Sequence, residues 1–167
     1  MADMNFQVFT ASLGDYCVLG HVFENIDHGR MGDYYAVFEQ NQTLREFAAK
    51  YSTPDNRLVG IIFKGESGDN FIAGAIVDGV TEAPDGAVLM HFPASDFLVT
   101  THDFTDTEPE CYPYIGMTVG YAHGENAKIP DGYERYTEHN SYMERFNFDH
   151  EANKYRTEVW FAIRKAE

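Results

Sequence analysis

The sequence predicts an α+β protein in which two pseudo-symmetric βαββ units form one antiparallel sheet. Three observations lead to this prediction. Apolar side chains recur with period two in several short segments, helical spacing appears in two longer segments, and these segments follow the same order twice. Two helices are expected to cover one face of the combined sheet. The other face, or a central cleft between the two halves, is expected to stay open.

The first half is expected at about residues 5–80. Its strands are predicted at residues 5–10, 16–23, 58–63 and 71–77. Helical spacing runs from Asp33 to Tyr51, and a break near residues 41–43 is compatible with it. The helix is expected to stop before Pro54, because the residue that precedes a proline disfavours helical geometry.

The second half is expected at about residues 87–165. Its strands are predicted at residues 88–94, 96–101, 142–146 and 156–163. A polar and acidic segment, residues 105–113, precedes a helix expected at residues 114–127. The length of 167 residues suits one domain, so residues 1–167 are expected to share a single core.

Composition narrows the classes of function. The net charge of −15 disfavours binding to nucleic acid and to anionic membranes, because both repel an acidic surface. Solubility explains much of this charge, and attraction of cationic small molecules is compatible with it. The two cysteines, Cys17 and Cys111, show no metal-ligand spacing, and the acidic turn at residues 64–70 lacks the EF-hand pattern. No metal and no cofactor are expected.

The location predicted from the sequence is the cytoplasm. The first residues lack the basic and apolar regions of a signal peptide, and no apolar run approaches the length of a membrane helix. A reducing compartment is also the simpler interpretation of two cysteines that lie far apart in the sequence. A single disulfide between them is kept as the alternative.

The two final strands carry the candidate site. With period two, Tyr142, Glu144 and Phe146 share one face of their strand. A carboxylate framed by aromatic rings attracts an organic cation through its charge and through the negative ring faces. The alternative is a solvated or salt-bridged glutamate, with Arg145 or Arg156 as its partner.

The last strand has two distinct faces. Its core face is expected to carry residues 157, 159, 161 and 163. Glu158 and Trp160 then lie on a face that is not obviously core. Trp160 is either a ligand contact or a core residue, because tryptophan buries a large area wherever it lies.

Four segments together resemble the GyrI-like effector-binding domains. These segments are the hairpin from Ile61-Ile62-Phe63-Lys64-Gly65 to Gly74, the stretch from Pro84-Asp85-Gly86 to Phe92-Pro93-Ala94-Ser95-Asp96-Phe97, the strand Tyr142-Met143-Glu144-Arg145-Phe146, and the strand Glu158-Val159-Trp160-Phe161-Ala162-Ile163. The family serves as ligand-sensing halves of multidrug-responsive transcription regulators and as stand-alone proteins, including integron cassette proteins. The resemblance spans nearly the whole chain.

The resemblance implies two βαββ halves around a cleft for bulky, apolar, often cationic ligands. A glutamate at the bottom of that cleft matches Glu144, followed by the aromatic Phe146, and an aromatic of the last strand matches Trp160. The family's usual Ile-Pro-Val ending is replaced by Phe161-Ala162-Ile163. Further candidate ligand-binding residues are Tyr142, Phe63 and His91, with Glu158 as the alternative acid of the cleft.

Three classes of function follow. The preferred one is binding of a hydrophobic, cationic small molecule, for sensing or sequestration, with a protein partner or a homodimer left open. The second is a hydrolase that opens strained electrophilic rings, in which Glu144, with its pKa raised by apolar surroundings, would act as the acid or base. The third is an interaction module that modulates a toxin target.

Overall fold

The computed structural model describes residues 5–103, 105–106, 112–125, 127–136, 138, 142–149, 151–152 and 154–167. Its strands are β1 (Phe6–Leu13), β2 (Tyr16–Phe23), β3 (Val59–Lys64), β4 (Asp69–Val77), β5 (Val88–Phe92), β6 (Ser95–His102), β7 (Thr105–Asp106), β8 (Tyr133–Arg135), β9 (Tyr142–Asp149) and β10 (Lys154–Lys165). Its helices are α1 (Met31–Gln40), α2 (Gln42–Ala49) and α3 (Tyr112–His123), with 3-10 turns η1 (His28–Arg30) and η2 (Pro54–Asn56).

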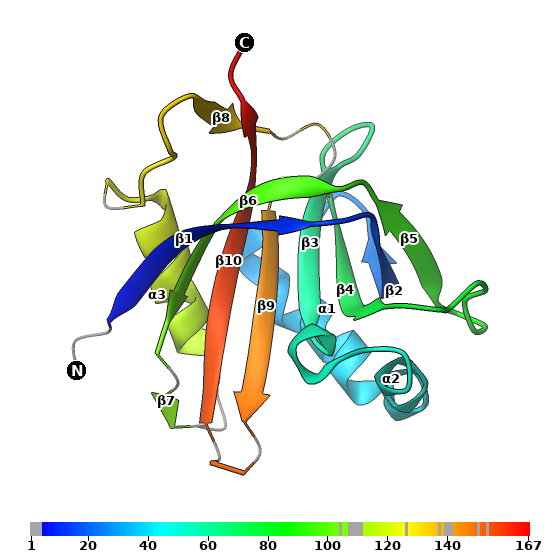
Figure 1. Ribbon diagram of the computed structural model, residues 1–167. Helices are drawn as coiled ribbons and strands as arrows, with labels where there is room; N and C mark the ends of the chain where they lie inside the picture. The colour runs from blue at the N-terminus through cyan, green and yellow to red at the C-terminus, as the bar shows by residue number, and fades with distance from the viewer. Residues whose placement is uncertain are drawn as a thin grey trace.

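The strands form one antiparallel sheet in the order β1-β6-β10-β9-β3-β4-β2-β5, and β7 and β8 pair with β10 (Figure 1). In the first half, β2 is followed by α1 and α2 and then by β3 and β4; in the second, β6 is followed by α3 and then by β9 and β10. The halves meet where β3 pairs with β9. They also exchange strands, because β1 pairs with β6 and β5 pairs with β2.

This arrangement confirms the α+β prediction and refines its helices. The helix expected between Asp33 and Tyr51 consists of α1 and α2, which are separated at Asn41. The side-chain oxygen of Asn41 accepts a hydrogen bond of 3.2 Å from the backbone N–H of Leu44, so it caps the start of α2. Much of the expected polar connector at residues 105–113 lies outside the described residues.

The helices cover one face of the sheet. Tyr35 and Phe38 of α1 and Leu44 of α2 pack with Ile62, Phe71 and Phe146 of the sheet. In the second half, Ala122 of α3 packs with Val159 and Phe161 of β10. Residues from distant parts of the chain therefore meet on the helix-covered face above the central strands.

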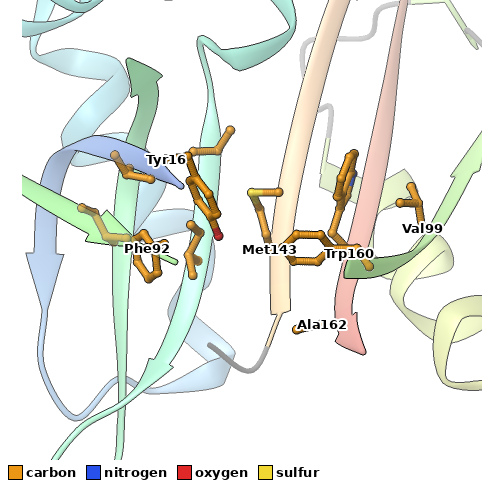
Figure 2. Close-up of a cluster of buried hydrophobic side chains, with 11 residues drawn as sticks. Tyr16, Phe92, Val99, Met143, Trp160 and Ala162 are labelled. Atoms are coloured by element: carbon orange, nitrogen blue, oxygen red, sulfur yellow. The ribbon is translucent and has the colours of Figure 1, made fainter. Parts of the chain in front are cut away.

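The other face of the sheet is not open, which corrects one of the sequence expectations. Eleven buried side chains from β2, β3, β4, β5, β6, β9 and β10 form a second cluster there, and Ala11 and Leu13 of β1 pack against it. The sheet curves so that strands from its two ends contribute to the same core. Figure 2 shows Met143 and Trp160 projecting from the neighbouring strands β9 and β10 into this cluster.

Candidate ligand-binding site

Glu144 lies at the centre of the helix-covered face and is 5% exposed. In the sheet register it stands between Val159 of β10 and Gly60 of β3, and Gly60 in turn faces Ala73 of β4. The neighbours of Glu144 across the sheet are therefore small or β-branched. Because they rise little above the backbone, they leave the carboxylate accessible to groups that approach from the helix layer.

The group that reaches Glu144 is the hydroxyl of Tyr35, which donates a hydrogen bond of 2.7 Å to the carboxylate Oε1. Tyr35 descends from α1 above Gly60. A Cβ atom at position 60 would overlap the Tyr35 hydroxyl and lie 2.6 Å from Cζ of Phe71. Gly60 is therefore needed for the close approach of the tyrosine to the strand.

Aromatic rings surround this hydrogen bond. The ring of Tyr35 meets those of Phe71 and Phe146 edge-on, with centroid distances of 5.2 Å and 5.1 Å. Tyr142 lies on the same face of β9 and packs against Phe161 at 5.7 Å. The structure thus places Tyr142, Glu144 and Phe146 on one face, as the sequence predicts, and frames the acid with rings from both halves.

Burial shifts the protonation of this cluster. Removal of the Glu144 carboxylate from water raises its pKa to about 7, although the hydrogen bond from Tyr35 acts in the opposite direction. Burial also raises the pKa of Tyr142, and the charges of Glu144 and Asp69 add to that increase. Near neutral pH, Glu144 therefore exchanges readily between its neutral and charged forms.

Glu144 also has no counter-charge among the described residues. Among the described residues, no lysine, arginine or histidine forms an ion pair with it. A buried carboxylate normally has a cationic partner, since the charged form otherwise loses its hydration without compensation. The sequence alternative in which Arg145 or Arg156 pairs with Glu144 is therefore wrong.

Trp160 and Glu158 lie on the opposite face from Glu144, because Val159 is the residue that faces Glu144 across the strand pair. Trp160 is 6% exposed in the second core cluster, so the core alternative for this residue is confirmed. The expectation that Trp160 and Glu158 share one site with Glu144 is corrected by the strand register.

Glu158 is a fully partnered acid. Its Oε1 accepts a hydrogen bond of 2.8 Å from the indole Nε1 of Trp160, and its Oε2 accepts one of 2.6 Å from Nδ2 of Asn147. The guanidinium of Arg156 lies 3.4 Å from the same Oε2, and that of Arg145 stacks over the Trp160 ring. These contacts give Glu158 a structural role in the core.

Phe63 and His91 also lie away from Glu144. Phe63 packs against Phe92 on the side of the second cluster. His91 belongs to β5, which is four strands away from β9 in the sheet. Its ring nitrogen Nδ1 contacts the thiol of Cys17 at 3.2 Å. The structure does not bring either residue into the cluster around Glu144.

A pocket of about 670 Å³ adjoins this cluster on the helix-covered face. Phe146 and Phe148 of β9 and Phe38 of α1 form its apolar part, and Arg45 and Arg57 lie at its polar margin. Glu144 itself does not line the pocket. Phe146 does, and its ring contacts the ring of Tyr35, whose hydroxyl is bonded to Glu144. The volume lies within the usual range of small-molecule pockets.

Three residues of the cluster, Tyr35, Gly60 and Phe71, are absent from the site residues predicted from the sequence. A glycine within an apolar strand indicates a close approach of another group, so Gly60 carried a readable signal. Tyr35 carried none, because helical spacing does not show which strand residue a helix side chain will meet.

Two further findings concern the described residues only. No helix among them has both the length and the apolar character needed to cross a membrane. No group of three or more histidine, cysteine, aspartate or glutamate residues there is arranged to hold a metal ion.

Comparison with known proteins gives a clear likeness in fold alone. No protein-family model matches the chain, and no curated protein matches its sequence. Among solved structures, SAV2435 bound to tetraphenylphosphonium is similar, with a TM-score of 0.64, 11% identity, and coverage of 95% of this chain and 94% of that one.

Two further structures are similar over nearly their whole length. The integron cassette protein VCH_CASS2 from the mobile metagenome of Vibrio cholerae has a TM-score of 0.58 and 14% identity, covering 97% of this chain and 99% of that one. The EcmrR C-terminal domain has a TM-score of 0.57 and 16% identity, covering 96% and 99%. In the EcmrR–DNA complex, the likeness covers 58% of the EcmrR chain. The chain thus has the fold of the GyrI-like effector-binding domains.

Proposed function

We propose that this protein binds hydrophobic organic cations on the helix-covered face of its sheet, with Glu144 as the counter-charge. The observation that carries the proposal is a buried carboxylate that, within the described part of the chain, has no cationic partner and accepts a hydrogen bond from one tyrosine hydroxyl. An organic cation supplies the missing charge, and the rings of Tyr35, Phe71 and Phe146 provide negative faces and apolar contact. Tyr142 lies beside the acid as a further contact.

The proposed site unites the two halves of a single domain, residues 1–167. Half one supplies Tyr35 and Phe71, and half two supplies Glu144 and Phe146. Since Glu144 is 5% exposed, a ligand must replace the Tyr35 hydroxyl to touch the carboxylate. The pocket beyond Phe146 provides volume for the apolar body of such a ligand. Support also comes from the fold, since SAV2435 of similar fold is bound to tetraphenylphosphonium.

The net charge of −15 favours the same class of ligand. It attracts cations at long range and repels phosphates, so direct binding of nucleic acid is not part of the proposal. The charge alone does not define a site, and the test must separate this general attraction from the local effect of Glu144.

Two probes of equal shape and opposite charge make that separation. Tetraphenylphosphonium is expected to bind the wild-type protein, whereas tetraphenylborate is expected to bind far more weakly. Glu144→Gln keeps the shape of the side chain and is expected to weaken tetraphenylphosphonium binding by about tenfold or more, as measured by calorimetry. Glu66→Gln is the matched control, because it removes the same charge from an exposed loop.

The proposal fails if Glu144→Gln binds the cation as tightly as Glu66→Gln does while both remain folded. Equal loss in both variants would also contradict it, because net charge would then explain the affinity. Circular dichroism and the melting temperature of each variant establish that the fold is retained.

One observation favours a second candidate, the hydrolase. A carboxyl group with a pKa of about 7 beside two tyrosines suits general acid or base catalysis near neutral pH. Incubation with a strained cyclopropane electrophile, followed by mass spectrometry, separates the two functions. A product heavier by one water that disappears in Glu144→Gln indicates hydrolysis, and an unchanged ligand mass together with a raised melting temperature indicates binding.

A further inference from the structure

Strand β1 (Phe6–Leu13) forms one end of the sheet and pairs only with β6 among the described strands. Its sequence FQVFTASL contains no charged residue, in a chain with 39 aspartate, glutamate, lysine and arginine residues. Edge strands of monomeric proteins are usually short or protected by charges, proline or bulges, because their free N–H and C=O groups can pair with another chain. At eight residues, β1 is long and shows none of these protections.

The strand is held firmly in place along its length. Near its start, the ring of Phe6 stacks on Tyr121 of α3 with a centroid distance of 4.5 Å. Near its end, Ala11 and Leu13 pack against the second core cluster. Between these anchors, Phe9 is 45% exposed, one of the few large apolar side chains on the surface of the described residues. A rigid, uncharged edge with an exposed aromatic at its centre is pre-organised for pairing.

We propose that β1 is a dimerisation edge along which two copies of this chain join their sheets antiparallel. A two-fold axis through Phe9 places this residue opposite Phe9 of the second copy. An aromatic pair directly across two strands stabilises a sheet and removes both rings from water. The two-fold arrangement also pairs every outward backbone group of one edge with its equivalent on the other.

The lack of charged side chains on β1 favours a second copy as the occupant, because a charged partner strand would find no counter-charge on this edge. A partner strand must approach a molecule with a net charge of −15, and the β1 strand of another copy brings no acidic side chain to the contact. The acids near the two ends of β6 already accept hydrogen bonds from β1. Asp96 accepts a hydrogen bond from Ser12, and Asp103 accepts one from Gln7, each at 2.6 Å. The opposite end of the sheet, β5, has five residues followed by Pro93 and offers a shorter edge.

The expected dimer has a salt dependence opposite to that of an ion-paired interface. Two copies of charge −15 repel each other, and salt reduces the screening length from about 10 Å at 0.1 M to about 3 Å at 1 M. Association is therefore expected to strengthen with salt. One strand pair buries less surface than a standard interface, so a micromolar dissociation constant is expected.

Sedimentation velocity of the full chain between about 1 and about 200 µM, at both salt concentrations, tests this proposal. Wild-type protein is expected to show a monomer–dimer equilibrium. Phe9→Lys places like charges directly opposite and is expected to raise the dissociation constant by about tenfold or more. Val37→Lys is the matched control, because Val37 is 46% exposed on α1, and it is expected to dimerise like the wild type.

Amide hydrogen exchange locates the interface independently of any substitution. Protection is expected to increase with protein concentration at residues 6–13. A monomer at the highest concentration and salt would overturn the proposal, as would equal association of Phe9→Lys and Val37→Lys. Concentration-dependent protection confined to another segment would also overturn it. The proposal does not depend on ligand binding, so its outcome leaves the role of Glu144 to its own test.

Discussion

The two faces of the β9–β10 strand pair each hold a buried glutamate, and the two glutamates differ in almost every other respect. Glu144 and Glu158 are both 5% exposed. Where the structure describes the chain, Glu158 has an indole, an amide and a guanidinium as partners, whereas Glu144 has one tyrosine hydroxyl. Equal burial therefore goes with different surroundings. Glu158 joins core side chains, whereas Glu144 is the acid for which we propose a ligand.

The largest expected effect is a gain of stability in Glu144→Gln at alkaline pH. Burial raises the folded-state pKa of Glu144 from its ordinary value of 4.5 to about 7, so the unfolded chain ionises first as the pH rises. The wild type then loses stability between pH 4.5 and 7 and stays at the lower level above that range. The glutamine variant avoids this loss and is expected to be more stable by about 3 kcal/mol at pH 8.

Urea unfolding across this pH range measures the difference. It is expected to shrink to nearly zero at pH 4, where both side chains are neutral. A variant that is less stable than the wild type at pH 8 would show that the ionised Glu144 side chain stabilises the fold. It would contradict the expectation that burial of this charge lowers the free energy of unfolding.

Glu158→Gln is expected to have the opposite sign. The substitution weakens charge-assisted hydrogen bonds from Trp160 and Asn147 and removes the ion pair between Arg156 and position 158, so a loss of about 2 kcal/mol is expected at neutral pH. Thermal unfolding compared with Glu144→Gln provides the measurement. If both substitutions shift the melting temperature in the same direction at pH 8, the contrast between the two faces is wrong.

A smaller effect is expected from Tyr35→Phe. The ring and its packing against Phe71 and Phe146 remain, but the carboxylate of Glu144 loses its hydrogen-bond donor. Stability above pH 7 is expected to fall by about 1 kcal/mol, and the pKa of Glu144 is expected to rise further. The pH midpoint of the stability curve reports that pKa. An unchanged midpoint would indicate that the hydroxyl does not control the acid.

Local pattern was sufficient to predict the eight longer strands and the face shared by Tyr142, Glu144 and Phe146, because period-two alternation fixes which side chains point together. It missed β7 and β8, because two or three residues are too few to show an alternation. Local pattern did not place Trp160 in the core. It gave one core face for the last strand, the face that the helices cover, and Trp160 lies on the other face. The strand exchange of β1 and β5 and the curvature of the sheet create the second core, and both depend on contacts between residues far apart in the chain. Tyr35 was missed for the same reason.

The most direct test of the central claim is the pH dependence of tetraphenylphosphonium affinity between pH 5.5 and 8.5. A cation that binds the charged form of Glu144 must displace its proton, so wild-type affinity is expected to rise about tenfold per pH unit below pH 7 and to level off above it. Glu144→Gln is expected to bind weakly and without this rise. A wild-type affinity that does not change with pH, or a glutamine variant that retains the same dependence, would contradict the account.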